Sequence, residues 1–188
     1  MARPKSDAKR EAILEAAIRI VGEQGLSAST AAMAKQAGVA QGSLFNYFPT
    51  KSDLLNAAYL RLKDELNDAV LAGLPDSADT RRQLHHLWTR WLHWGTSNVA
   101  HRRALAQLSV SDQITESSRA ASFKRSTIGI GIVQRASAGG VLGHQPIDFV
   151  ATIVDAIASA TMDHMIRVPA QAETYRETAF DALWKALQ

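Results

Sequence analysis

The sequence predicts an all-helical protein, and three observations carry that prediction. Apolar residues recur at the three- and four-residue spacing of amphipathic helices, and no segment alternates with the two-residue period of a β-strand. Gly or Pro closes most of the helical stretches. Hydrophobic residues make up 46% of the 188 positions and charged residues 21%, so the chain can bury a core and is not of the disordered class.

Nine helices are expected along the chain. Asp7 is placed to cap the first helix, Ser29 and Thr30 open the second, and Thr50 or Ser52 caps the fourth. The expected ranges are 7–24, 30–37, 41–47, 50–71, 79–98, 101–111, 116–137, 147–167 and 171–187. Three short helices followed by six longer ones predict two domains, at residues 1–50 and 51–188.

The positive charge of the chain is concentrated at one end. Residues 1–51 contain seven Lys or Arg against four Asp or Glu, whereas residues 52–188 contain fourteen of each. The formal net charge of +3 therefore belongs to the first quarter of the sequence. A basic segment before an electroneutral remainder indicates a polyanionic partner for the N-terminal domain.

Residues 30–48 have the pattern of a helix-turn-helix. Two helices that cross steeply need small side chains at their contact, which Ala34 and Ala37 supply, and Gly38 suits the turn between them. Val39 and Leu44 are then expected to point into the small core of this domain.

The remaining side chains of the third helix are expected to face outward and to bind DNA. They are Gln41, Gly42, Ser43, Asn46 and Tyr47. A Gln side chain can pair with the donor and acceptor of adenine, and a Gly lets a helix start approach the duplex. Thr30 and Lys51, at the starts of the second and fourth helices, are expected to contact phosphates. The alternative is a three-helix bundle without a DNA contact.

The N-terminal part of the sequence resembles the TetR family of transcription regulators. The resemblance covers residues 9–60 and rests on Ala12-Ile13-Leu14-Glu15-Ala16-Ala17, Gly25, Thr30, Ala34, Ala37-Gly38-Val39, Gly42-Ser43-Leu44-Phe45, Tyr47-Phe48, Lys51 and Leu54-Leu55. A second resemblance, to the RamR-type repressors of multidrug-efflux genes, rests on residues 1–6, Trp94-Gly95, Arg102-Arg103-Ala104, Gln107-Leu108, Val110-Ser111 and Thr161-Met162-Asp163.

The resemblance implies nine helices, a homodimer, a palindromic double-stranded DNA operator and an inducer cavity in the C-terminal domain. A small apolar or cationic inducer would release the protein from DNA, and the protein would act as a repressor. The sequence departs from the family at Phe45, where the family often has Tyr, so a phosphate contact through that hydroxyl is lost.

The last two expected helices are the candidates for dimerisation. Ile153, Ile157 and Thr161 lie on one apolar stripe, and Phe180 and Leu183 lie on another. Two such helices from each subunit can form a four-helix bundle. The alternative is that both stripes face the core of their own subunit.

An aromatic ligand site is expected in the C-terminal domain. Tyr59, Trp88 and Trp91 stand out because only 6% of the residues are aromatic, and aromatic side chains often line clefts for flat apolar ligands. Asp155, in an apolar helix, could neutralise a cationic inducer. A core role for the aromatic residues, and an ordinary exposed carboxylate for Asp155, are the alternatives.

Catalysis, cofactors and metals are not expected. The chain has no cysteine, which excludes disulfides, thiolate nucleophiles and Cys-based zinc sites. His86 and His93 share a helical face but lie about 10 Å apart along its axis, too far to bind one ion together. No secretory leader or membrane span is expected, which favours a cytoplasmic protein.

Two further functions stay open beside the ligand-responsive regulator. One is a DNA-binding regulator controlled by a protein partner, which a dry C-terminal core would favour. The other is an all-helical enzyme or carrier with a purely structural N-terminal bundle, which turnover of a bound molecule without specific DNA binding would favour.

Overall fold

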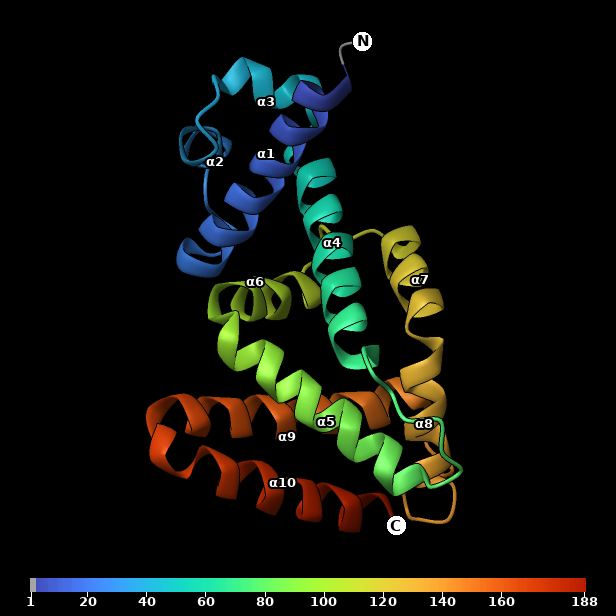
Figure 1. The fold of residues 1–188 in the computed structure, drawn as a ribbon. Helices are drawn as coiled ribbons and strands as arrows, with labels where there is room; N and C mark the ends of the chain where they lie inside the picture. Colours follow the sequence, from blue (N-terminus) through green and yellow to red (C-terminus); the bar gives the residue numbers. More distant parts are fainter. Residues whose placement is uncertain (1–2) are drawn as a thin grey trace. The chain divides into compact units, whose positions relative to one another are not determined.

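The computed structural model describes residues 3–188, with side chains from residue 7 onward, and it is all-helical over that range. Residues 1 and 2, part of the stretch behind the second resemblance, lie outside the described residues. The helices are α1 (Arg3–Gln24), α2 (Thr30–Gln36), α3 (Gln41–Tyr47), α4 (Lys51–Leu71), α5 (Thr80–Ser97), α6 (Val99–Ser109), α7 (Glu116–Arg125), α8 (Thr127–Ser137), α9 (Ile147–Arg167), the 3₁₀ turn η1 (Pro169–Gln171) and α10 (Ala172–Leu187) (Figure 1).

The all-helical prediction is confirmed, with differences at three helices. The expected helix at 116–137 is divided into α7 and α8 at Ser126, where a run of Ser, Thr, Ile and Gly residues has weak helix propensity. The first helix begins at Arg3, so Asp7 lies inside α1 and does not cap it. The sixth helix begins at Val99, two residues earlier than expected.

Two compact units divide the described chain, and they do not follow the expected boundary at residue 50. Unit 1 contains residues up to Glu65 together with Asn98–Phe123, and unit 2 contains Leu66–Ser97 and Lys124–Gln188. α6 therefore belongs to the same unit as the N-terminal helices, although about thirty residues of unit 2 separate them in sequence. The order of the helices along the chain does not predict that α6 packs with the N-terminal helices.

Unit 1 is built on a close contact between α1 and α6, and in Figure 1 the C-terminal end of α1 lies over α6. A Cβ atom at Gly22 would lie 2.4 Å from the carbonyl oxygen of Ala100, so only glycine allows these two backbones to approach so closely. Gln107 on α6 also donates its Nε2 to the carbonyl of Val21 (3.3 Å). Fully buried apolar side chains fill the rest of the unit, among them Ile13, Ala17, Met33, Leu44, Leu54, Leu55, Leu62 and Leu108.

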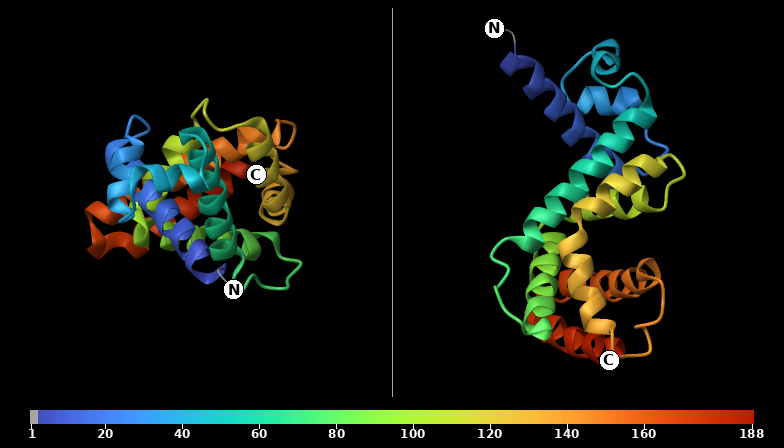
Figure 2. Two further views of the ribbon diagram at one scale, coloured as in Figure 1. Left: turned by 90° about the horizontal axis from the view of Figure 1, so that it is seen from above. Right: turned by 90° about the vertical axis from the view of Figure 1, so that its right-hand side faces the viewer.

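Unit 2 is held by a large apolar core contributed by α5, α8, α9 and α10, whose packing Figure 2 shows from two further sides. Its buried members are Leu84, Leu87, Trp88, Leu92, Ile132, Ala136, Val150, Val154, Ala158, Met162, Phe180, Leu183 and Leu187. Among the described helices, α9 is long and apolar enough to cross a membrane, which the sequence analysis did not anticipate. Length and composition do not distinguish a core helix from a membrane span, and α9 supplies four residues to this core.

Candidate nucleic-acid interface

The turn between α2 and α3 has the geometry that the sequence predicts. Ser29 caps α2 by accepting a hydrogen bond from the Ala32 amide at its Oγ (3.1 Å). Gly38 has φ +67°, a left-handed conformation that side chains with a Cβ rarely adopt. Met33, Ala34 and Leu44 are buried, so α2 and α3 are locked together through their inner faces.

The outer face of α3 carries the polar residues predicted to read DNA. Gln41, Gly42 and Asn46 are exposed, and Ser43 and Tyr47 are half-buried. Gln41 Nε2 lies 3.4 Å from Thr30 Oγ1, a weak hydrogen bond that joins the starts of α3 and α2. A Cβ added at Gly42 would have no neighbouring atom within 4 Å, so packing inside the chain does not require a glycine there.

Lys51 takes a different position from the one expected of a phosphate clamp. Its half-buried Nζ donates a 2.7 Å hydrogen bond to the carbonyl of Leu26, between α1 and α2. The neighbouring Thr50 caps α4, since its amide and hydroxyl donate to Asp53 Oδ2 (3.0 and 2.8 Å) and its Oγ1 accepts from the Asp53 amide. Lys51 thus fixes the start of α4, and its contact with phosphate stays a prediction.

Phe45 is a surface residue of α3 that the sequence analysis treated only as a departure from a family pattern. Its side chain is 39% exposed, which is unusual for a large apolar residue on so short a helix. Phe45 lies four positions after Gln41, so the two side chains share one helical face. That spacing was the available signal for adding Phe45 to the outer face of α3.

A histidine joins three helices of unit 1 behind this surface. His101 on α6 has its Nε2 3.3 Å from Glu15 on α1 and its Nδ1 3.2 Å from Glu65 on α4. Burial alone would raise the pKa of Glu15, but hydrogen bonds from Arg19 and His101 and their positive charges outweigh it and hold the pKa below its ordinary value. No local pattern of residues signals this contact, because it depends on the folding of α6 against α1.

The residues predicted to bind a ligand lie in different surroundings. Tyr59 is buried in unit 1. Trp88 is 2% exposed in the core of unit 2, where its Nε1 donates to the Arg176 carbonyl (3.0 Å) and its ring packs near Phe180. Trp91 is half-buried against the same core, and Asp155 is exposed on α9. Trp88 is therefore a core residue, which was the alternative to a ligand contact.

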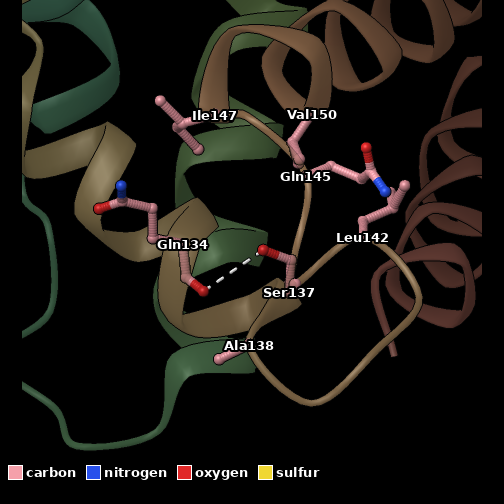
Figure 3. Close-up of a pocket in the computed structure, with 8 residues that line it drawn as sticks. Gln134, Ser137, Ala138, Leu142, Gln145, Ile147 and Val150 are labelled. Atoms are coloured by element: carbon pink, nitrogen blue, oxygen red, sulfur yellow. Dashed lines mark hydrogen bonds between the residues drawn. The ribbon is translucent and has the colours of Figure 1, made fainter.

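A hollow of about 340 Å³ occurs elsewhere in unit 2, between the end of α8, the loop after it and the start of α9 (Figure 3). Ser137 at its wall is buried and donates to the carbonyls of Val133 and Gln134 (3.1 and 3.3 Å). Its other lining residues are Gln134, Ala138, Leu142, Gly143, Gln145, Ile147 and Val150. None of the four predicted ligand residues contributes to it.

Three of the five predicted dimerisation residues are buried in the core of their own unit, as the alternative expects, and a role of these residues in a dimer stays a prediction. Thr161, Phe180 and Leu183 are 7%, 3% and 0% exposed within the single chain. Ile157 packs against the same core, and Ile153 is half-buried. The apolar stripes were read correctly as packing surfaces, but periodicity cannot tell which partner covers them. Within the described residues, no group of three His, Cys, Asp or Glu side chains could hold a metal ion.

Comparison with known proteins identifies the N-terminal segment. Residues 13–58 match the family model of the bacterial regulatory proteins, tetR family. Over 75 residues the chain is 36% identical to the HTH-type transcriptional regulator BetI of Stenotrophomonas maltophilia, which covers 39% of this chain and 38% of that protein. Over 99 residues it is 25% identical to the nucleoid occlusion factor SlmA of Haemophilus influenzae, or 52% of this chain and 45% of SlmA.

The matched segments thus span about two fifths of the length of these curated relatives. The fold extends the similarity over nearly the whole chain. A solved structure from Shewanella sp. PV-4, assigned to the tetR family of transcription regulators, superposes with a TM-score of 0.83 at 28% identity, covering 95% of this chain and 97% of that one. BetI and the Shewanella protein are both named as transcription regulators, the class that the helix-turn-helix pattern predicts for this chain.

Proposed function

We propose that this chain, whose N-terminal domain belongs to the tetR family of bacterial regulatory proteins and whose fold is that of solved members, is a ligand-responsive transcription regulator. It binds a palindromic DNA operator as a homodimer in the cytoplasm. The observation that carries the proposal is the outer face of α3, where Gln41, Gly42 and Asn46 are exposed on a helix fixed by a helix-turn-helix core.

The chemistry of that face suits the major groove. Gln41 has an amide that can donate to and accept from one adenine, and Ser43 and Asn46 add donors and acceptors on the same helix. Phe45 adds an apolar surface that can contact the methyl group of thymine. The charge excess of residues 1–51 supplies the phosphate attraction that is independent of sequence.

The homodimer is proposed to form through faces of α9 and α10 that the subunit core leaves uncovered. Ala156 and Ala160 on α9 and Ala182 and Ala186 on α10 are all exposed. Small side chains allow helices of two subunits to approach closely. Ala160→Arg should convert the dimer to a monomer in sedimentation equilibrium, whereas Ala120→Arg, on the exposed side of α7, should not.

Release from DNA by a small apolar or cationic inducer, repression, and a RamR-type role at multidrug-efflux genes are the finer parts of the proposal. Trp91 and Asp155 are the remaining candidates for inducer contacts in unit 2, since Trp88 is a core residue. The packed core of unit 2 also supports the second candidate, a regulator that answers to a protein partner.

The experiment that tests the function is selection of genomic DNA fragments by the purified protein, followed by titration at increasing salt. A dimer with one α3 per half-site predicts half-site centres about 34–36 Å apart, or a multiple of that spacing. Affinity should fall steeply with salt as counterions are released. Affinity that does not depend on salt, or retention of no fragment above background, would refute the proposal.

Contact assignment within the interface can be tested with two variants. Gln41→Ala should cost about 1–3 kcal/mol and relax base preference at one operator position. Lys51→Ala should weaken binding to all sequences alike, and a reduced salt slope would show a direct phosphate contact. An unchanged slope would assign Lys51 to its hydrogen bond with Leu26 alone.

Ligand control is tested by following tryptophan fluorescence while apolar and cationic dyes are added, with and without operator DNA. Linkage requires DNA to weaken an inducer by the same factor by which the inducer weakens DNA. Quenching that operator DNA leaves unaltered would mean binding without induction. No response to any compound would favour the protein-partner candidate.

A further inference from the structure

Asn56 on α4 makes several hydrogen bonds that the proposed DNA-binding surface does not use. Asn56 donates its Nδ2 to the carbonyls of Ser52 (2.9 Å) and Gln113 (2.8 Å). Its Oδ1 accepts from the amide and the hydroxyl of Thr115 (2.9 and 3.2 Å). Both ends of one amide side chain are thereby satisfied, chiefly by the loop between α6 and α7.

That loop is itself ordered by internal contacts. Arg119 on α7 donates to the carbonyls of Ser109 and Ser111 (2.7 Å each), and Ser111 and Ile114 are buried. Thr115 also accepts from the Ser118 amide at the start of α7 (3.2 Å). The loop is therefore a preformed backbone surface to which Asn56 attaches α4.

The attached part of α4 lies next to the DNA-reading helix in the chain. α3 ends at Tyr47 and α4 begins at Lys51, so three residues separate them. Lys51 fixes the first turn of α4 to Leu26, and Asn56 fixes the second turn to the loop at 113–115. A movement of this end of α4 must displace α3, because a connection of three residues has little slack.

We propose that Asn56 is a positioning residue for DNA binding. It holds the start of α4 against the α6–α7 loop and thereby places α3. The inference rests on the proposed function. Asn56 lies on α4 and not on the outer face of α3, so it affects DNA through helix placement and reads no base. It extends the DNA-binding unit to residues that follow α6, which no position in the helix-turn-helix motif reveals.

Asn56→Ala tests the role, with Asn67→Ala as a matched control in the same helix, because Asn67 is half-buried in α4. The first variant should lower affinity for the selected operator by about 5–150-fold, the usual range of coupling between sites. Base preference and the salt slope should stay unchanged, because no DNA contact is lost. Asn67→Ala should bind like the unaltered protein.

A measurement on the unaltered protein keeps the proposal testable if Asn56→Ala fails to fold. Reciprocity of coupling requires operator DNA to tighten the contact in return, so hydrogen exchange at the amides of 113–115 should slow when DNA binds. DNA binding slows exchange through global unfolding at all protected amides, so the amides of unit 2 serve as the reference. The inference expects slowing at 113–115 beyond that reference, whereas a residue that only stabilises the fold would show no excess. Unaltered protein that binds no duplex would refute the proposed function instead.

Two results would overturn the inference alone. The first is operator binding by folded Asn56→Ala at the affinity of the unaltered protein. The second is exchange at 113–115 that slows no more than the unit 2 reference with operator DNA which the protein demonstrably binds. A changed base preference in Asn56→Ala would replace positioning by direct readout and would also overturn it.

Discussion

Each unit buries an apolar core, but the contacts that are most prominent within unit 1 differ from those within unit 2. In unit 1, side chains from distant parts of the sequence bind specific backbone and carboxylate groups, as Asn56, His101 and Lys51 do. In unit 2, a continuous apolar core includes Trp88 and Phe180, and its ion pairs, such as Arg81 with Asp181, lie at the exposed surface.

The difference teaches what each unit needs from its sequence. Apolar burial is non-directional, and it stabilises a unit without fixing the direction of each helix to a fraction of an ångström. Hydrogen bonds and close backbone contacts are directional. A unit that presents α3 to a regular duplex benefits from the second kind, and the following predictions test that contrast.

The largest expected effect is on the core of unit 2. Trp88→Ala removes a fully buried ring and leaves the Arg176 carbonyl without its donor, so the free energy of unfolding should fall by about 3–5 kcal/mol. Urea denaturation followed by circular dichroism measures this loss. Trp91→Ala, at a half-buried position, should cost less. A Trp88 that lines an open ligand cavity would be removed at little cost, and that result would contradict the core assignment.

Next in size is a change that breaks the close contact of unit 1. Gly22→Ala places a Cβ 2.4 Å from the Ala100 carbonyl oxygen, so α1 and α6 must move apart, at about 1–3 kcal/mol. Gly139→Ala is the matched control, because its Cβ meets nothing within 4 Å and its φ is not positive. Equal thermal unfolding midpoints for the two variants would show that α1 and α6 are not tightly packed.

The features that the sequence predicts are those set by residues close together in the chain, and the features that it misses depend on residues far apart. The Ser29 cap, the Gly38 turn and the exposed side of α3 depend on neighbours within a few residues, and they were predicted from spacing alone. The membership of α6 in unit 1 depends on Gly22 meeting Ala100, and Gly22 looked like any helical glycine. Local pattern carries no information about which distant segment a helix will meet.

The same limit applies to the predictions for the C-terminal half. Thr161, Phe180 and Leu183 lie on apolar stripes, which identify a buried face but not the subunit that buries it. Trp88 was conspicuous because tryptophan is scarce, and scarcity does not distinguish a cavity wall from a core. These decisions need the packing of α5 against α9 and α10, which is set by the whole unit.

A smaller effect compares the two units through their carboxylates. Glu15 in unit 1 and Glu177 in unit 2 both have a pKa below the ordinary value, because hydrogen bonds and positive charges from Arg and His outweigh the effect of burial. Each contributes stability that is present above the pKa of the unfolded chain and is lost as the pH falls through the lowered folded pKa.

Glu15→Gln and Glu177→Gln should therefore lower unfolding free energy at neutral pH and converge with the unaltered protein in acid. Both side chains are more than a third exposed, so solvent screening limits each loss to at most about 1 kcal/mol. Glu15 should have the larger effect, because His101 joins it to a third helix. Denaturation curves at pH 3 to 7 measure the convergence, and a variant difference that grows in acid would reverse the assigned sign.

Gly42→Ala should have the smallest effect on stability but a clear effect on operator binding. Its Cβ would meet nothing within 4 Å, so Gly42→Ala should be neutral or should stabilise α3 by up to about 0.5–1 kcal/mol through helix propensity. If the start of α3 enters the major groove closely enough to need a glycine, the same methyl group should lower operator affinity. Gly139→Ala, with an equally open position outside α3, controls for a general effect of the substitution. Fluorescence anisotropy with the selected operator and thermal denaturation give the two quantities separately. Unimpaired binding by Gly42→Ala would mean that the start of α3 stays farther from the duplex than proposed, and it would move the reading surface toward Phe45 and Asn46.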